Sequence, residues 1–160
     1  MELAANVVSV TFTVGVILPA VFFLGSQDFY YVTLLGGVVG ANVLVMGIKP
    51  LMAALFGDAD WSLRPVGARD CDALCDGGAS GGRPGFPSGH VTTAAMCVAG
   101  LWLRGRDPLV LWLGVPWIAA MGWARWAKHC HNWQQIAGGV VFGGACALGL
   151  QWLYAHMISG

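Results

Sequence analysis

Charged residues are scarce in this sequence. Asp, Glu, Lys and Arg make up 10% of its 160 residues, whereas hydrophobic residues make up 57%. A soluble domain usually carries about 25% charged residues, so the deficit favours a lipid environment. The formal net charge is +0, and the lack of a basic excess argues against a nucleic-acid-binding protein. The length predicts a single domain over residues 1–160.

Two long stretches have no charge at all. One lies between Glu2 and Asp28, and the other runs over residues 29–48. A helix needs about 20 apolar residues to cross a bilayer, and both stretches meet that length. The first has no basic start and is too long for a signal peptide, so both are predicted to be membrane helices.

Three further apolar segments follow, at residues 88–103, 108–127 and 132–157. With them the sequence predicts an all-α fold, a polytopic membrane helical bundle with about five transmembrane helices. A buried half-helix is the alternative for residues 88–103, because this segment is short. Residues 57–87 are rich in Gly, Asp and Pro and are predicted to form one long polar loop.

Alternating spans decide which connections share a side of the membrane. The N-terminus, the 57–87 loop and the 128–131 turn fall together, opposite the 104–107 turn and the C-terminus. Arg104 and Arg106 favour a cytoplasmic location for the latter side, because basic residues are enriched in cytoplasmic loops. The long loop would then be exoplasmic or lumenal, although its side holds more basic residues overall.

Two of the five cysteines, Cys71 and Cys75, lie in the long loop. An oxidising compartment would allow a disulfide between them. Carboxylates surround them, at Asp70, Asp72 and Asp76. These groups resemble a loose metal site, but no histidine is nearby, so we expect neither a metal ion nor a cofactor.

Glycines recur at a spacing of four, as Gly36 with Gly40 and Gly139 with Gly143. Such spacing lets membrane helices approach closely. Packing within one chain is the simpler interpretation. A homo-oligomer or a partner membrane protein on these faces is the alternative.

The strongest chemical signal is Pro87-Ser88-Gly89-His90 at the start of an apolar segment. Ser88 is a favoured N-cap residue, and the free N–H groups at a helix start attract phosphate. Gly89 lets an oxyanion approach the backbone closely. Histidine titrates near neutral pH, so His90 is suited to protonate a leaving oxygen. An ordinary capped helix with an incidental histidine is the alternative.

A second signal is Arg125, followed by His131 and Gln135. His131 and Gln135 share one face if a helix begins near Asn132. Gln135 would then accept a hydrogen bond from the His131 ring, fix its tautomer and leave the other nitrogen as a nucleophile. Arg125 offers a planar fork for phosphate oxygens. A polar turn within an interfacial aromatic belt is the alternative.

Lys49 directly follows the second uncharged stretch and is expected at a helix terminus. There it would either snorkel to the interface or pair with phosphate. Three histidines and several arginines fall on the same side of the membrane. Snorkelling of single residues does not explain that grouping.

These elements resemble the type 2 phosphatidic acid phosphatase superfamily of lipid phosphate phosphatases. That family carries a Lys, then Arg-Pro, then PSGH, then Arg-x5-His-x3-Asp. Here PSGH is intact at residues 87–90, and Arg125 and His131 keep the spacing of the last element. The string HNWQQ at residues 131–135 is similar to the dolichyl-diphosphatase branch, where His-x-Trp-x-Gln is usual. The resemblance covers residues 49–144.

Some features depart from the family pattern. Lys49 lies farther than usual from the Arg-Pro pair at Arg64, and a second such pair begins at Arg83. Arg64 is the better match for the family arginine, and Arg83 is its rival. Gln135 stands where the family usually has Asp. The family commonly has one membrane helix more than this sequence, whose first helix is expected to be missing.

The resemblance implies a two-step, metal-independent phosphate transfer. His131 would attack phosphorus to form a phosphohistidine. His90 would protonate the leaving group and then help water to cleave the intermediate. The phosphate would be held at Lys49, Arg64 or Arg83, Ser88, Gly89 and Arg125. His129 is out of register with the motif and is expected to be dispensable.

The sequence thus predicts a membrane enzyme that hydrolyses a lipid phosphate or a polyisoprenyl diphosphate. The alternative is a structural or assembly membrane protein that retains a degenerate phosphatase fold, which Gln135 and the loose Lys–Arg spacing favour. A small transporter or channel fits less well. Transport sites lie near the midplane of the membrane, whereas the charges here gather at one interface.

Overall fold

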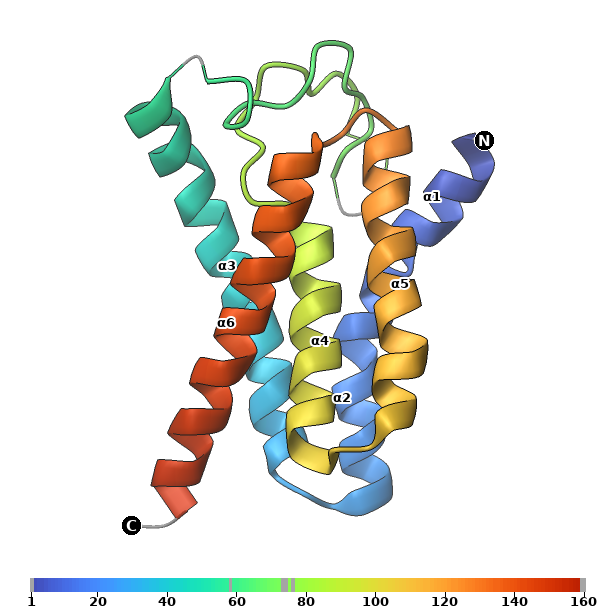
Figure 1. Ribbon diagram of the computed structural model, residues 1–160, viewed down its shortest axis with the longest axis vertical. Helices are drawn as coiled ribbons and strands as arrows, with labels where there is room; N and C mark the ends of the chain where they lie inside the picture. Colours follow the sequence, from blue (N-terminus) through green and yellow to red (C-terminus); the bar gives the residue numbers. More distant parts are fainter. Residues whose placement is uncertain (1, 58, 73–74, 76, 159–160) are drawn as a thin grey trace.

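A computed structural model of the chain describes residues 2–57, 59–72, 75 and 77–158. Figure 1 shows a bundle of helices with irregular loops gathered at one end. The helices are α1 (Glu2–Val10), α2 (Phe12–Ser26), α3 (Tyr30–Phe56), α4 (Gly89–Gly105), α5 (Pro108–Ala127) and α6 (Trp133–Ile158). Over these described ranges the chain forms no strand, only isolated bridges within the loop. The predicted all-α class is confirmed.

Some of these helices are long and apolar enough to cross a membrane. They are Glu2–Ser26, in which α1 and α2 meet at Thr11, together with Tyr30–Phe56 and Trp133–Met157. This agrees with a membrane protein, because each exceeds the length of about 20 residues that a bilayer requires.

Helix α4 lies at the centre of the bundle, between α2, α3, α5 and α6 (Figure 1). It is continuous from Gly89 to Gly105. Among the described residues, the helices long and apolar enough to span a membrane do not include α4, so the choice between a full span and a buried half-helix stays a prediction. Nearly every residue from His90 to Leu101 is buried. The low apolarity of this segment follows from its place, since its Thr, Cys and Gly residues contact other helices rather than lipid.

The α4–α6 contact depends on glycines. A Cβ on Gly139 would lie 2.8 Å from the Ser88 carbonyl oxygen, and one on Gly143 would lie 2.5 Å from that of Thr92. Packing within the chain is therefore confirmed for this pair. A Cβ on Gly36 or a Cβ on Gly40 would meet nothing within 4 Å. A partner on that face stays a prediction.

Helix α3 is longer than the uncharged stretch predicts. It continues through Pro50 to Phe56, so Lys49 lies inside the helix rather than at its terminus. The residues after Pro50 are again apolar, and they prolong the helix although a proline cannot donate a backbone hydrogen bond.

Helix α6 begins where a side chain caps it. Asn132 Oδ1 accepts a hydrogen bond from the Gln135 N–H at 2.9 Å, which satisfies one of the free donors of the first turn. This cap fixes the start of α6 so that His131 lies just ahead of it.

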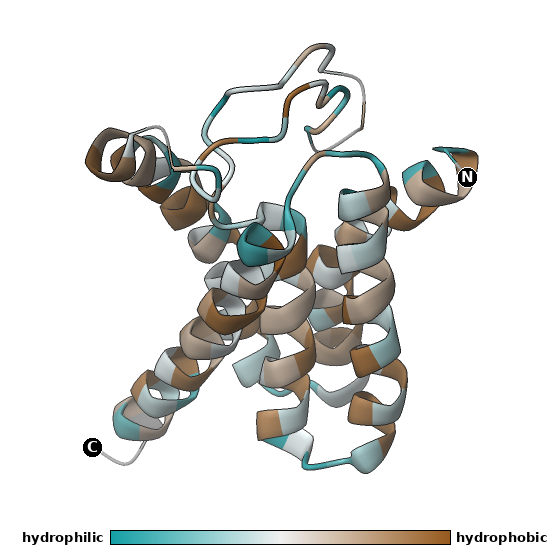
Figure 2. Ribbon diagram, turned by 45° about the horizontal axis from the view of Figure 1, so that its top comes forward, coloured by the Kyte–Doolittle hydropathy of each residue, from teal (hydrophilic) through white to brown (hydrophobic). Residues whose placement is uncertain are grey.

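The connections and the chain termini divide between the two ends of the bundle. The N-terminus, the long loop and the α5–α6 connection lie at one end, and the C-terminus and the α4–α5 turn lie at the other (Figure 1). Hydrophilic residues are frequent in the long loop, whereas hydrophobic residues are frequent in the helices (Figure 2). The predicted grouping of the connections is confirmed for the bundle.

Candidate active site

The PSGH motif forms the start of α4. Ser88 is its N-cap residue, and the Ser88 N–H donates to the Gln135 carbonyl of α6 at 3.0 Å. The Ser88 hydroxyl makes no capping bond, contrary to expectation. Its buried Oγ has no hydrogen-bond partner among the residues that the structure describes. Because an unsatisfied buried hydroxyl is unfavourable, this oxygen is available to a ligand.

The next two residues, Gly89 and His90, lie in the first turn of α4. His90 is buried, with its ring centroid 4.6 Å from that of Phe12 in α2. A Cβ on Gly89 would meet Asn42 and Val45 of α3 at 3.7 Å, an ordinary van der Waals distance. Packing therefore does not require a glycine at this position, and its approach to phosphate stays a prediction.

Gln135 holds His131 in one tautomer. The Nδ1 atom of His131 lies 2.8 Å from Oε1 of Gln135. The Nε2 atom of Gln135 donates to the carbonyl oxygens of Trp61 and Leu63, at 3.1 and 2.7 Å. These acceptors determine which end of the amide is nitrogen, so its oxygen faces the ring and Nδ1 carries the proton. The lone pair of His131 is then on Nε2, as a nucleophile requires.

Burial and three cationic side chains lower the pKa of His131. Burial is the largest cause that holds the pKa of His131 well below its usual value. The positive charges of Arg64, Arg125 and Lys49 lower it further, and the hydrogen bond with Gln135 opposes them. His131 is therefore neutral near pH 7 and keeps its lone pair.

The two candidate arginines of the loop lie opposite each other. The Arg64 N–H donates to the Arg83 carbonyl at 2.8 Å, and the Gly82 N–H donates to the Arg64 carbonyl at 3.1 Å. Arg64 is half-buried, whereas Arg83 is exposed. Burial and then the charge of Arg83 lower the pKa of Arg64, and Asp72 raises it. The charge of Arg64 thus lowers the pKa of His131, whereas the charge of Arg83 lowers the pKa of Arg64.

A cavity of about 340 Å³ opens beside these groups. Its wall includes Lys49, Arg64 and Arg83. His131 and Arg125 are only 2% and 0% exposed. The cavity therefore reaches the basic side chains but does not expose the imidazole.

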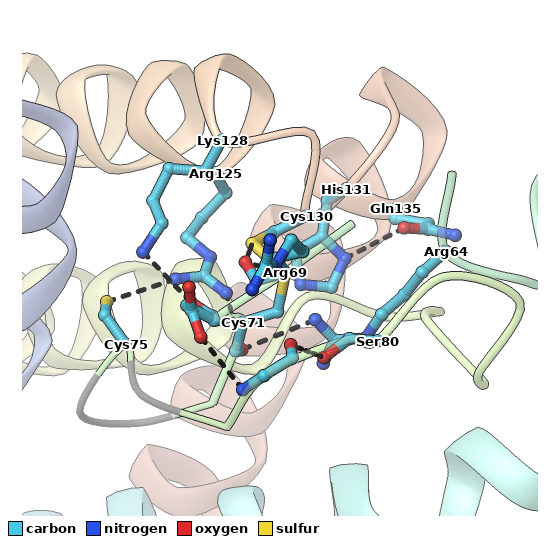
Figure 3. The surroundings of a disulfide bond; sticks show 12 residues. Arg64, Arg69, Cys71, Cys75, Ser80, Arg125, Lys128, Cys130, His131 and Gln135 are labelled. Carbon is cyan, nitrogen blue, oxygen red and sulfur yellow. Dashed lines mark hydrogen bonds between the residues drawn. A yellow bond between two sulfur atoms is a disulfide. The ribbon is translucent and has the colours of Figure 1, made fainter. Parts of the chain in front are cut away.

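Several of the basic side chains donate hydrogen bonds to main-chain oxygens of the loop (Figure 3). Arg125 Nη2 donates to the Cys71 carbonyl at 2.6 Å, and Arg64 Nη1 donates to the same oxygen at 3.4 Å. Lys128 Nζ donates to the Asp70 carbonyl at 2.9 Å. The guanidinium fork of Arg125, which was expected to face phosphate, thus faces the loop.

The disulfide that an oxidising compartment would allow between Cys71 and Cys75 does not form. Cys71 is bonded to Cys130, whose Cα lies 5.4 Å away although 59 positions separate the two residues in the sequence. Cys75 is a free thiol.

The Cys71–Cys130 disulfide also affects the loose metal site that the Asp and Cys residues of the loop resembled. The sulfur of Cys71 is not a thiolate and cannot bind a metal ion in this state. Across the described part of the chain, no group of three or more His, Cys, Asp or Glu residues could hold a metal ion. Asp76 lies outside the described residues.

His129 lies apart from His131. It is exposed and lines a different cavity of about 530 Å³, together with Glu2 and Lys128. Its backbone is left-handed, with φ 54°, and this turns the chain between the two histidines.

Several groups of the site were not foreseen from the sequence. Asn132 caps α6 and donates from Nδ2 to the Asp60 carbonyl at 2.8 Å. An Asn before an apolar segment is a known N-cap signal, so this role could have been predicted. The carbonyls of Trp61, Leu63 and Cys71 carry no such signal, because every residue has one.

A family model described as the PAP2 superfamily matches residues 30–158. Comparison with curated proteins and comparison with solved structures each gave no match. The matched region runs from the start of α3 to the end of α6 and so includes the whole PSGH motif, Lys49, Arg125 and His131. The chain therefore belongs to the PAP2 superfamily.

Proposed function

We propose that the protein is a membrane phosphatase that hydrolyses a lipid phosphate or a polyisoprenyl diphosphate through a phosphohistidine. Its membership of the PAP2 superfamily suggests a phosphatase. One observation carries the proposal. His131 is buried among three cationic side chains, in the tautomer that leaves its Nε2 lone pair available.

The first step is an attack on phosphorus by Nε2 of His131. An N–P bond forms while the bond from phosphorus to the leaving oxygen breaks. Negative charge lies on the equatorial oxygens during this step. Lys49, Arg64 and Arg125 would stabilise it, since each places a positive charge near His131.

The start of α4 supplies neutral donors to the same phosphate. Its free N–H groups favour an anion, and the buried Oγ of Ser88 lies beside them. Gly89 lets an oxygen come close to this backbone. Arg83, on the wall of the adjoining cavity, would bind an outer oxygen or a second phosphate.

His90 is the proposed general acid. It gives its proton to the leaving oxygen in the first step. In the second step it accepts a proton from the water that attacks the phosphohistidine. Inorganic phosphate leaves, and both histidines return to their starting states. The scheme needs no metal ion or cofactor.

Gln135 supports a place in the dolichyl-diphosphatase-like branch. A carboxylate at this position would favour the charged form of His131. The amide orients the ring without adding a negative charge, and its donor end is already bonded to the loop carbonyls. A neutral partner is therefore compatible with a nucleophile that must lose its proton to react.

The substrate is proposed to be amphiphilic and to enter from the bilayer. The site lies at the loop end of helices long enough to cross a membrane. We place this end on the exoplasmic or lumenal side, because the Cys71–Cys130 disulfide requires an oxidising compartment. Arg104 and Arg106 lie at the opposite end, as cytoplasmic residues would.

The test is phosphate release from a polyisoprenyl diphosphate and from phosphatidic acid by the purified protein in detergent. We expect His131→Ala to lower kcat/KM by at least about a thousandfold, because it removes the nucleophile. His129→Ala is the matched control and should retain most activity, since His129 is exposed and lines a different cavity. Equal losses in the two variants would show that His131 is not the nucleophile.

A structural or assembly protein with a degenerate phosphatase fold is the second candidate. The Cys71 carbonyl favours this second candidate, because its oxygen accepts hydrogen bonds from Arg64 and Arg125. This alternative predicts no phosphate release from either lipid by the native protein.

A further inference from the structure

We propose that residues 69–72 form an inhibitory strap, which the Cys71–Cys130 disulfide holds on the phosphate-binding cations. This proposal rests on the proposed function, because it concerns how phosphate gains access to the same site. Three observations carry it: the bonds of the strap to basic side chains, its position at the cavity wall, and its covalent anchor.

The strap places carbonyl oxygens where phosphate oxygens would bind. The Cys71 carbonyl accepts from Arg125 Nη2 at 2.6 Å and from Arg64 Nη1 at 3.4 Å. The Asp70 carbonyl accepts from Lys128 Nζ at 2.9 Å. A phosphate oxygen that binds Arg125 Nη2 and Arg64 Nη1 together must displace the Cys71 carbonyl.

The strap also connects the wall of the cavity with the buried Arg125. Asp72 lines the cavity with Lys49 and Arg64. Cys71, the preceding residue, is buried together with Arg125 and His131. The chain thus passes from the cavity wall onto the Arg125 guanidinium within one residue.

The disulfide anchors the strap to the turn that carries the nucleophile. Cys130 directly precedes His131, and the N–H groups of both residues donate to the Arg125 carbonyl, at 3.0 and 3.2 Å. On its other side the strap is held by the Asp70 N–H, which donates to the Gly78 carbonyl at 2.8 Å. The bridge is the covalent part of this attachment, so breaking it should allow the Cys71 carbonyl to leave.

A dithiol reductant would release the strap. One thiolate of the dithiol attacks a sulfur of the bridge, forming a mixed disulfide and freeing the other cysteine as a thiolate. The second thiol of the reductant then breaks the mixed disulfide. The products are the thiols of Cys71 and Cys130 and the disulfide of the reductant, and two electrons have passed to the protein.

The size of the effect follows from the fraction of molecules in which the strap is displaced. When only that fraction can bind a ligand, the apparent affinity falls in proportion to it. If the strap is displaced in about one molecule in ten, its removal tightens phosphate binding by about tenfold.

The experiment measures binding of inorganic phosphate to the full-length protein in detergent by titration calorimetry. The native protein is compared with Cys71→Ser/Cys130→Ser and with native protein reduced by dithiothreitol. Both cysteines of the bridge are buried, so the double variant provides an open strap that does not depend on access of the reductant. We expect about tenfold tighter phosphate binding in both opened forms.

A matched control separates the effect of the disulfide from that of the two cysteines in the helices, Cys97 and Cys146. Cys97→Ala/Cys146→Ala keeps the disulfide and should bind phosphate like the native protein until it is reduced. Dithiothreitol should leave the phosphate affinity of Cys71→Ser/Cys130→Ser unchanged. If the double variant does not fold, as judged by circular dichroism, reduced native protein decides the question.

Unchanged or weaker phosphate binding in the opened forms would overturn the proposal, because the bridge would then support the site rather than block it. Phosphate release from lipid substrates, measured in parallel, tests the proposed function separately. Tighter phosphate binding without turnover in any form would support the strap and overturn the catalytic role.

Discussion

The side-chain amide of Gln135 has a donor end and an acceptor end, and the site uses both. The acceptor end faces His131, and the donor end faces the Trp61 and Leu63 carbonyls. Its main-chain carbonyl also accepts from Ser88. Gln135 therefore joins the two motifs of the family to the start of the long loop.

Gln135→Glu should destabilise the protein. A carboxylate cannot donate to the Trp61 and Leu63 carbonyls, and each unsatisfied buried group costs about 1–3 kcal/mol. The melting temperature in detergent, followed by tryptophan fluorescence, should fall. Gln134→Glu makes the same chemical change at the neighbouring, half-buried position and should lower it less. Equal melting temperatures for Gln135→Glu and the native protein would contradict this account of the amide.

The choice between Arg64 and Arg83 can be tested through the pKa of His131. Burial and then the charge of Arg64 lower this pKa, so Arg64→Gln should raise it. Because the proposed attack needs neutral His131, we expect kcat/KM to decline as the pH falls through the pKa of the free enzyme. The acid limb of the pH profile should therefore move to higher pH in Arg64→Gln.

Arg83→Gln is the matched control for this measurement. Arg83 is exposed and acts on Arg64, so its removal should move the acid limb less. An equal or larger displacement in Arg83→Gln would identify Arg83 as the arginine that faces the nucleophile.

Among the helices, the contact between α4 and α6 decides the geometry of the site. It aligns the helix start that carries Ser88 and His90 with the helix start that carries Gln135. The contact is close because Gly139 and Gly143 present no side chain to α4. A small change in this spacing would move the two histidines relative to each other.

Gly143→Ala should separate α4 from α6 and destabilise the protein by about 1–3 kcal/mol, because the added Cβ would overlap the Thr92 carbonyl oxygen. Gly144→Ala is the control on the next residue, where a Cβ meets nothing within 4 Å. That change should be neutral or stabilise by up to about 1 kcal/mol, as alanine favours helix. Thermal unfolding in detergent measures both variants. Equal losses of stability would show that the close approach of α4 to α6 does not depend on Gly143.

For the molecule as a whole, the disulfide and the free thiol together report orientation. A membrane-impermeant maleimide added outside intact cells or spheroplasts should label Cys75, because this thiol is free and half-buried at the loop end. Cys71 and Cys130 should react only after denaturation and reduction. Loss of the label in Cys75→Ser is the control. Labelling that requires permeabilised membranes would place the loop in the cytoplasm.

Much of the architecture could be predicted from spacing along the chain. The gaps between charges located the helices, because crossing a bilayer requires a run of apolar residues. The hydrogen bond between His131 and Gln135 was predictable because residues four apart near a helix start share a face. PSGH was recognisable as the start of a helix, although the Ser88 hydroxyl does not cap it.

The tertiary structure alone decided the contacts between distant segments. Cys71 pairs with Cys130 rather than with the nearby Cys75, because folding brings the loop onto the end of α5. The oxygens that orient Gln135 and the oxygen that accepts a hydrogen bond from Arg125 all belong to main-chain carbonyls. Every residue has such an oxygen, so only the three-dimensional path of the chain determines which of them reach the site.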